Sequence, residues 1–174
     1  TAVARRLRRP GRMSGPMIDS VVHYLHEAGI PFRLTSYPAP EPEPRVAYRP
    51  IPTAQLVETH VVLVDGQPAL ACTLCGDYAS LAALSTETGG VVEESDAEDL
   101  SGEYHGASGP IPPLGGLVGV PLFVDSRVAE LTNVAFRAFG PNDYLEISYD
   151  DLALVEHPRI ASFGEAGALP PHQP

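Results

Sequence analysis

The residues best suited to chemistry lie in one stretch rich in glycine and proline, Gly106 to Asp125, which reads GASGPIPPLGGLVGVPLFVD. Glycine lets a backbone approach a partner closely or adopt positive φ, whereas proline fixes φ and has no N–H. A loop that alternates the two is stiff, and its few remaining N–H groups can point at one target. Because the apolar run Val120–Val124 follows the loop and stops at an acid, we expect a loop propped on a buried strand and able to hold a small polar ligand. The alternative is a tight connection without a chemical role.

Cysteine and histidine residues elsewhere give weaker signals. Cys72 and Cys75 form a CxxC pair, but a structural zinc site with four cysteine ligands is excluded because the chain has only these two cysteines. Two structural thiols are the favoured interpretation. His23 and His26 have the spacing of a metal-binding pair without a third ligand nearby, so a solvated pair is favoured. His105, just before the loop, is a candidate acid or base, with a solvated loop histidine as the alternative.

The order of residues in the loop and strand resembles the YbaK-like family, the aminoacyl-tRNA editing domains found free or inserted in prolyl-tRNA synthetases. The GxxxP element of that family falls on Gly109 and Pro113, with Gly115 and Asp125 after it. Downstream, residues 133–140 look like the family's next strand and glycine turn, and residues 144–148 look like its last strand. The resemblance covers about residues 17–164.

The resemblance implies a binding site for the amino acid and its ester carbonyl, formed by backbone groups of Gly109, Pro110, Ile111, Pro112 and Pro113, with Gly115 and Asp125 as further substrate contacts. It also implies that a ribose hydroxyl of the substrate handles much of the proton transfer. That would explain why no Ser-His-Asp set or carboxylate pair is evident in this sequence. No metal or organic cofactor is implied.

One family residue is replaced here. The family carries a lysine on the strand before an Asp-Gly turn, which is thought to hold the terminal phosphate, and by register it falls on Thr59, with His60 beside it. Threonine has no charge to offer a phosphate, and a neutral histidine is only a weak donor. Since adjacent strand residues point to opposite faces, at most one of Thr59 and His60 is expected to enter the pocket. The arginines that could stand in for the lysine are Arg33, Arg49 and Arg137.

Composition and charge narrow the possible partners. The chain of 174 residues is long enough for one domain with a real core, and 44% of it is hydrophobic. No apolar run approaches the roughly 20 residues needed to span a bilayer, and no signal peptide is evident, so we expect a cytoplasmic protein without a membrane partner.

The net charge is −11 and no lysine occurs. Five of the 11 arginines lie in Thr1–Arg12, which leaves a charge of −16 on the rest. That acidity argues against an extensive nucleic-acid interface but leaves room for a small footprint on the acceptor end of tRNA.

The pattern of elements predicts a single α+β domain, with a mixed, curved sheet or partial barrel surrounded by helices. We expect a flexible basic arm over residues 1–16, the YbaK-like domain over 17–164 and a flexible tail over 165–174. The elements are predicted as helices at 16–29, 77–84, 95–100, 126–131 and 150–156, strands at 32–37, 57–64, 69–73, 91–92, 120–124, 133–140 and 144–148, and a proline-rich flap at 38–52. Asp65-Gly66 marks the turn of a hairpin, and Ser95 to Glu98 reads as a capping box.

Two functions follow. The first is a trans-editing hydrolase, an aminoacyl-tRNA deacylase that removes a small mischarged amino acid, with Thr59, His60 and His105 as catalytic candidates and the aminoacyl-tRNA acceptor end as partner. The second is a non-catalytic module of the same fold that binds a small amino acid, a nucleotide or a protein partner, since the lysine is lost. The loop and Asp125 favour the first, whereas the charge and Thr59 favour the second.

Overall fold

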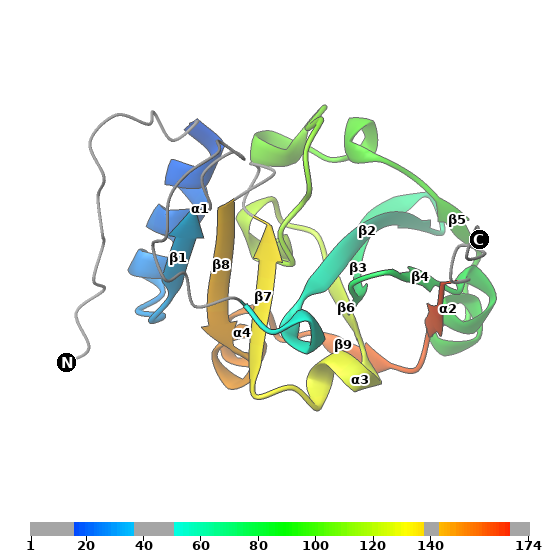
Figure 1. The fold of residues 1–174 in the computed structure, drawn as a ribbon. Coiled ribbons are helices and arrows are strands. Elements are labelled where there is room, and N and C mark those ends of the chain that lie inside the picture. Colours follow the sequence, from blue (N-terminus) through cyan, green and yellow to red (C-terminus); the bar gives the residue numbers. More distant parts are fainter. Residues whose placement is uncertain (1–15, 37–50, 138–142, 168–174) are drawn as a thin grey trace, which may run out of the picture.

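The computed structural model describes residues 16–36, 51–137 and 143–167, in which ten strands and four α-helices form an α+β domain (Figure 1). The arginine-rich start, most of the proline-rich segment with Arg49, and the last residues lie outside this part. The helices are α1 (Pro16–Glu27), α2 (Leu81–Thr88), α3 (Ser126–Ala129) and α4 (Tyr149–Glu156); the strands are β1 (Arg33–Ser36), β2 (Val57–Val64), β3 (Gln67–Leu74), β4 (Asp77–Ala79), β5 (Val92–Glu94), β6 (Leu122–Asp125), β7 (Asn133–Arg137), β8 (Asp143–Ser148), β9 (Arg159–Ala161) and β10 (Gly164–Ala166). Among the described helices, none has the length and apolar character needed to cross a bilayer.

The larger sheet is mixed and has the strand order β5-β2-β3-β6-β9. β2 and β3 form the expected antiparallel hairpin, with Val64 opposite Gln67 across a two-residue turn. Both turn residues have positive φ, 50° at Asp65 and 78° at Gly66, which is the type I′ geometry that an Asp-Gly pair favours. β6 pairs in parallel with β3 and with β9, so the end of the glycine- and proline-rich stretch enters the middle of the sheet.

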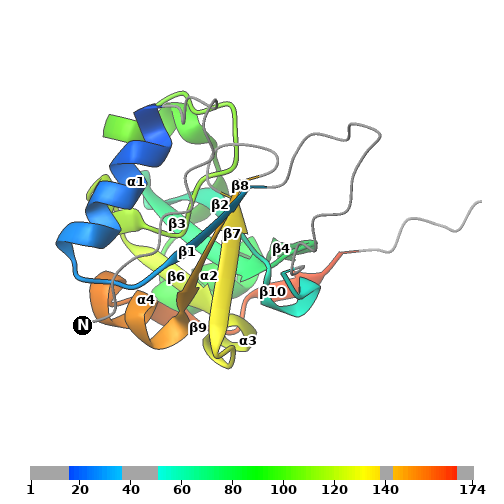
Figure 2. The same ribbon diagram turned by 60° about the vertical axis from the view of Figure 1, so that its left-hand side comes forward.

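A second, three-stranded sheet has the order β1-β8-β7 and is antiparallel. A parallel bridge between Leu56 and Ala135 joins it to the start of β2. Figure 2 shows α1 and α4 together on one side of this smaller sheet. The two sheets therefore meet at the N-terminal end of β2, and the predicted curved, mixed architecture is confirmed.

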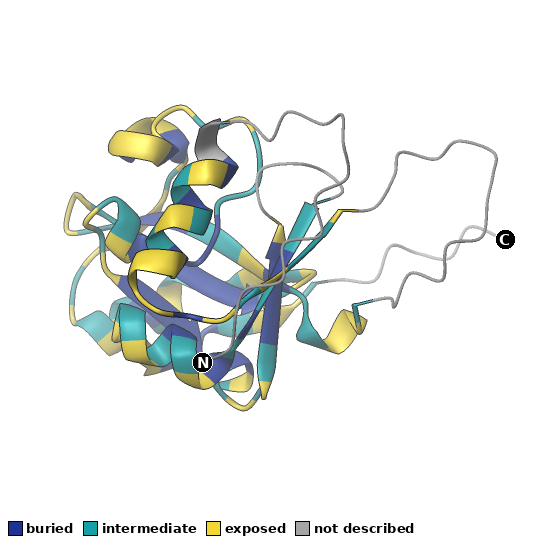
Figure 3. Ribbon diagram, turned by 90° about the vertical axis from the view of Figure 1, so that its left-hand side faces the viewer, coloured by how far each residue is buried: buried dark blue, intermediate teal, exposed yellow. Residues whose placement is uncertain are grey.

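Two hydrophobic cores lie on the two faces of the larger sheet. The bigger one joins side chains of α1 and α4 to both sheets, and the smaller one packs α2 against the other face. Val61 belongs to the bigger core and Val62 to the smaller, which confirms that β2 is buried on both faces. Figure 3 shows the buried residues concentrated in the strands, with exposed residues on the outer faces of the helices. β2 is thus a rigid support for anything built along it.

Two local predictions were wrong, and two short strands were not predicted. Residues 77–79 form β4, which pairs with β10, and α2 starts only at Leu81 because the Ser80 hydroxyl accepts a hydrogen bond from the Ala83 N–H and caps the helix there. The predicted helix after Ser95 is a 3₁₀ turn, η2 (Ala97–Asp99), capped by Asp96. β9 and β10 carried no recognisable sequence signal, because short strands gain their order from the neighbours with which they pair.

Glu156 at the end of α4 ties together three segments around the glycine- and proline-rich stretch. Its carboxylate accepts hydrogen bonds from the Tyr24 hydroxyl of α1 at 2.8 Å and from the Gly116 N–H at 2.9 Å. Gly116 lies in the 3₁₀ turn η4 (Gly115–Leu117), which follows the GxxxP segment Gly109–Pro113, called the signature loop from here on. The Glu156 carboxylate therefore ties the segment that follows the loop to helices α1 and α4.

Replacing Glu156 by alanine should lower the free energy of unfolding by about 1–3 kcal/mol, because the Tyr24 hydroxyl and the Gly116 N–H lose their acceptor. Urea denaturation followed by circular dichroism measures this change. Glu130→Ala is the matched control, since that exposed glutamate has no side-chain hydrogen bond within the described residues. Equal stability of the two variants would contradict the proposed anchoring role.

Candidate functional site

A cavity of about 230 Å³ lies where the two sheets meet, beneath the signature loop. Strand β2 contributes one wall, the ends of β7 and β8 contribute another, and the loop closes it. The lining residues are Leu56, Val57, Glu58, Thr59, His60, Cys75, Pro110, Ile111, Phe136, Arg137 and Tyr144. Four of the predicted site residues, Thr59, His60, Pro110 and Ile111, are therefore brought together.

The cavity has an apolar floor and a charged rim. Val57 and Phe136 are buried, at 5% and 2% exposure, and belong to the bigger core. Glu58, Cys75 and Arg137 are exposed, so they lie where the cavity opens to solvent. This arrangement suits a ligand with a short apolar group at one end and charges at the other.

Thr59 and His60 are both among the residues that line the cavity, while the expectation that only one of the two side chains enters it stays a prediction. β5 pairs with β2 only along Val62–Val64, so the segment before Val62 has its second edge free of that strand. A cavity at the edge of a strand meets consecutive residues, whereas a cavity on one face meets alternate ones. The site is therefore built on an open sheet edge.

The two residues differ in how their polar atoms are satisfied. Thr59 Oγ1 is buried and has no hydrogen-bond partner among the described residues. The His60 ring is held by Thr73, whose Oγ1 lies 2.9 Å from His60 Nε2. Burial lowers the pKa of His60, although the nearby Glu58 carboxylate opposes the shift, so the imidazole is neutral at pH 7.

The signature loop rests on the bigger core. Pro112 and Pro113 of the loop are buried, and Leu114 after them is completely buried. The Leu114 carbonyl accepts a hydrogen bond from the buried Tyr104 hydroxyl at 3.0 Å. Gly115 must be glycine for a steric reason, because a Cβ there would lie 2.3 Å from the Val120 carbonyl oxygen. These anchors leave Pro110 and Ile111 over the cavity, while Pro112, Pro113 and Gly115 support them from outside it.

Arg137, at the end of β7, is the one arginine among the residues that line this cavity. A hydrogen bond to the Tyr144 hydroxyl raises the pKa of Arg137, and the charge of Glu58 adds to this effect. Arg33 lies elsewhere: it is ion-paired with Glu146 and lines a separate hollow of about 410 Å³ that contains none of the predicted site residues.

Two predicted site residues are not part of the cavity lining. His105 is exposed, and its Nδ1 lies 2.8 Å from the Leu100 carbonyl oxygen. Asp125 is 1% exposed, and its carboxylate accepts hydrogen bonds from the N–H groups of Phe163 and Gly164 and from the N–H and Nε of Arg127. Asp125 thus caps α3 and ties β6 to the C-terminal segment, the structural alternative to a ligand contact.

The other candidate groups have structural surroundings. Cys72 is buried and Cys75 is exposed, and both are free thiols. Burial raises the pKa of the Cys75 thiol, as does its hydrogen bond to Glu58, and the S–H therefore persists as a donor. In the described residues, His, Cys, Asp and Glu side chains form no group of three or more that could hold a metal ion.

Comparison of the sequence with known protein families shows to which family the chain belongs. Residues 38–154, more than half of the chain, match the family described as "Aminoacyl-tRNA editing domain". The chain belongs to this family. Curated proteins include no significant match to the sequence of this editing domain.

Solved structures share the fold of the editing domain. A proposed trans-editing enzyme for prolyl-tRNA synthetase superposes with a TM-score of 0.65 at 15% identity, covering 88% of this chain and 100% of that one. A scaffold from epitope-grafting work gives a TM-score of 0.69 at 17% identity over 88% of this chain and 99% of that one. A proposed signal transduction protein from Marinobacter aquaeolei VT8 gives 0.64 at 20% identity, where 84% of this chain covers 30% of that one. Identities this low show a YbaK-like fold and nothing further.

Some cavity residues were missed from the sequence. Glu58 and Tyr144 stood in predicted strands without a motif, and Phe136 reads as an ordinary core residue. Arg137 was one of three possible replacements for the lysine. The only available signal for Glu58 was its place next to Thr59, where the family carries its lysine, and His60 shares that signal.

Replacing Asp125 by asparagine should destabilise the editing domain by about 2–4 kcal/mol at pH 7, because the amide group presents a donor to N–H groups that need an acceptor. Burial alone would raise the pKa of Asp125, but hydrogen bonds from Gly164, Phe163 and Arg127 outweigh it and lower the pKa. A lowered pKa stabilises the fold above the ordinary value of about 4, and this contribution is lost as the pH falls through the pKa of the folded state.

The difference between wild type and Asp125→Asn should therefore shrink below about pH 4 in urea denaturations from pH 7 to pH 3. Exposed Asp150→Asn is the control and should change stability little. A normal stability of Asp125→Asn combined with lost ligand binding would show instead that Asp125 contacts the substrate.

Proposed function

We propose that this editing domain hydrolyses the ester that joins a small, wrongly attached amino acid to tRNA. The observation that supports it is the cavity beneath Pro110 and Ile111, whose volume of about 230 Å³ suits a short side chain. Drug-sized ligands need about 300–1,000 Å³. A second sieve of this kind is useful because one methylene group changes binding by only about 1–3 kcal/mol in a synthetase pocket. The domain would act in the cytoplasm, where it would contribute to translation fidelity.

In the proposed reaction, water adds to the ester carbonyl carbon, and the bond to the ribose oxygen then breaks. The products are the free amino acid and tRNA with its terminal hydroxyl restored. The developing oxyanion needs a hydrogen-bond donor. In the segment from Gly109 to Pro113 only Gly109 and Ile111 carry a backbone N–H, because the other three residues are prolines. We assign the oxyanion contact to the Ile111 N–H, since Ile111 lines the cavity.

Proton transfer is shared in this proposal between the substrate's ribose hydroxyl and His60. A neutral imidazole can accept a proton near pH 7 and then return it from the imidazolium form, and the contact with Thr73 holds the ring in one orientation. Thr59 offers a buried hydroxyl without a partner among the described residues, so a hydrogen bond to substrate would satisfy it. His105 has no assigned role because it does not line the cavity.

A second function is favoured by the charges on β2. Where the family carries a cation, this strand presents Glu58, Thr59 and His60 to the cavity. The editing domain would then be a non-catalytic module that binds a small amino acid, a nucleotide or a protein partner. Its acidic charge would limit the contact with tRNA to the acceptor end in either case.

The first function predicts that wild-type protein deacylates at least one of tRNAs charged with Ala, Cys, Ser or Thr faster than buffer does. Ile111→Trp should lower kcat/KM by at least about tenfold, because the indole fills the cavity and displaces the loop. Release of radiolabelled amino acid measures both. The control Leu154→Trp places the same ring on an exposed position of α4, where the side chain is 68% exposed.

Hydrolysis of none of the four charged tRNAs would exclude the enzyme in favour of the binding module. Equal activities of Ile111→Trp and Leu154→Trp would mean that the reaction takes place outside this cavity.

A further inference from the structure

The rim of the cavity carries two opposite charges that do not neutralise each other directly. Glu58 and Arg137 both line the opening and are both exposed. No ion pair within 4.0 Å joins them, although ion pairs are found elsewhere among the described residues. Two separate charged groups at one opening suit a ligand that itself carries one positive and one negative charge.

Neutral neighbours hold each of the two charges in place. The Glu58 carboxylate accepts a hydrogen bond from the Cys75 thiol at 3.2 Å and a longer one from the Gly76 N–H at 3.4 Å. Arg137 donates to the Tyr144 hydroxyl. A carboxylate can accept about four hydrogen bonds and a guanidinium can donate five, so both groups keep capacity for a ligand.

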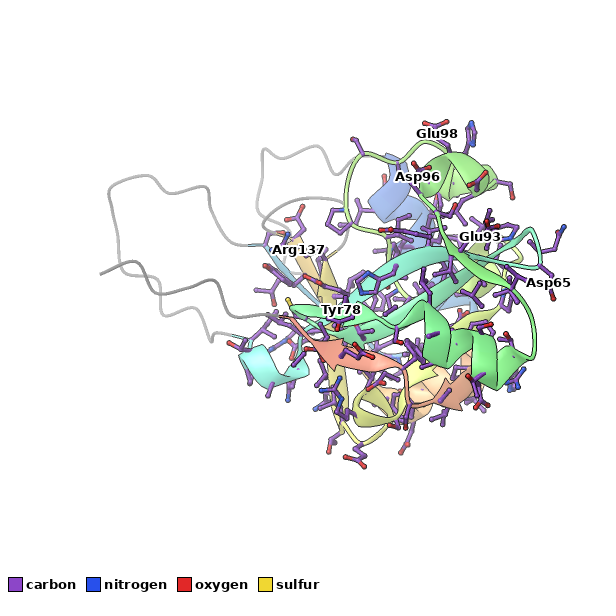
Figure 4. All side chains as sticks on the ribbon, turned by 90° about the vertical axis from the view of Figure 1, so that its right-hand side faces the viewer. Asp65, Tyr78, Glu93, Asp96, Glu98 and Arg137 are labelled. Atoms are coloured by element: carbon purple, nitrogen blue, oxygen red, sulfur yellow. The ribbon has the colours of Figure 1, made fainter. Side chains whose placement is uncertain are left out.

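Arg137 differs from the other arginines of the described residues. Arg33, Arg127 and Arg159 each form an ion pair with a carboxylate, whereas Arg137 forms none with a described residue. Figure 4 shows Arg137 on the opposite side of the view from the labelled acids Asp65, Glu93, Asp96 and Glu98. In a chain with twice as many acids as arginines, a guanidinium that forms no ion pair with a described residue is available to an external anion.

We infer that the rim of the cavity binds both charged groups of an aminoacylated terminal nucleotide. Arg137 binds the phosphate of the nucleotide, and Glu58 binds the α-ammonium of the attached amino acid. A guanidinium binds phosphate in a bidentate manner, and a carboxylate is the natural acceptor for an ammonium. The short side chain would then enter the apolar floor formed by Val57 and Phe136. Arg137 on β7 would thus supply the positive charge that the family lysine supplies at the position of Thr59 on β2.

This assignment rests on the proposed function, which supplies the identity of the ligand. It adds the expectation that the site distinguishes a free α-amino group from a blocked one. A substrate whose α-amino group is blocked would leave the Glu58 carboxylate without its partner. The site should therefore select aminoacyl groups with a free amine over N-acylated ones, and Cys75 would act as a positioning residue for that selection.

Four stable probes separate the two contacts. The first is 3′-alanylamino-3′-deoxyadenosine 5′-monophosphate, in which an amide replaces the labile ester. The second lacks the phosphate, the third has an N-acetylated alanine, and the fourth combines both changes. Calorimetry gives the Kd of each probe for wild type, Arg137→Gln and Glu58→Gln, with Arg159→Gln and Glu93→Gln as matched controls. Both control residues are exposed and outside the cavity lining.

Wild type and both controls should prefer the phosphate and the free amine, each by about 10- to 100-fold in Kd. Arg137→Gln should lose the preference for phosphate and keep that for the amine, and Glu58→Gln should do the reverse. Each preference is a ratio measured on one preparation, so a variant that is partly unfolded still gives a valid result.

The inference is overturned if wild type binds none of the probes, or if either variant keeps both preferences. Deacylation of charged tRNA by the same wild-type preparation tests the proposed function separately. Binding with both preferences but without hydrolysis would support the rim assignment and exclude the enzyme. Hydrolysis by a wild type that prefers neither the phosphate nor the free amine would support the enzyme and overturn the rim assignment.

Discussion

The hydrogen bond from the buried Tyr104 hydroxyl to the Leu114 carbonyl is the contact on which the site depends. It fixes the end of a loop whose prolines leave few N–H groups of its own to hold it in place. Leu114 packs into the bigger core, and the Gly116 N–H reaches Glu156 just beyond it. With its far end held in this way, the loop can extend Pro110 and Ile111 over the edge of β2 and create a hollow there.

The hollow exists because β2 changes its surroundings along its length. Toward its C-terminal end the strand is paired on both sides, by β3 and β5, and is buried on both faces. Toward its N-terminal end β5 no longer pairs with the strand, and a bridge between Leu56 and Ala135 joins the smaller sheet to its start. The same strand therefore supplies rigidity at one end and unpaired edge at the other, a combination that suits binding without loss of stability.

Charge distribution reconciles the acidity of the protein with the anionic ligand proposed for it. Within the described part of the chain, the arginines away from the cavity form ion pairs with carboxylates, as Arg127 does with Asp77 and Asp125. Asp125 itself is the acid of the signature, and its oxygens are used to cap α3 and to hold the C-terminal segment. The residues that line the cavity include one guanidinium, that of Arg137, and one carboxylate, that of Glu58. The proposed recognition would therefore be local and would not need a positive surface.

The sequence by itself determined the α+β class, the Asp-Gly hairpin, helix α1 and the signature loop, because each of these depends on local patterns of apolar, glycine and proline residues. The resemblance to the editing family added Thr59 and His60 as candidates, at the position of the family lysine. Only the tertiary structure decided that Thr59 and His60 are both among the lining residues of the cavity, that His105 and Asp125 are not, and that Arg137 from another sheet is. Such placements depend on which strand edges are left unpaired and on contacts between residues far apart in the chain. Local propensities do not encode these.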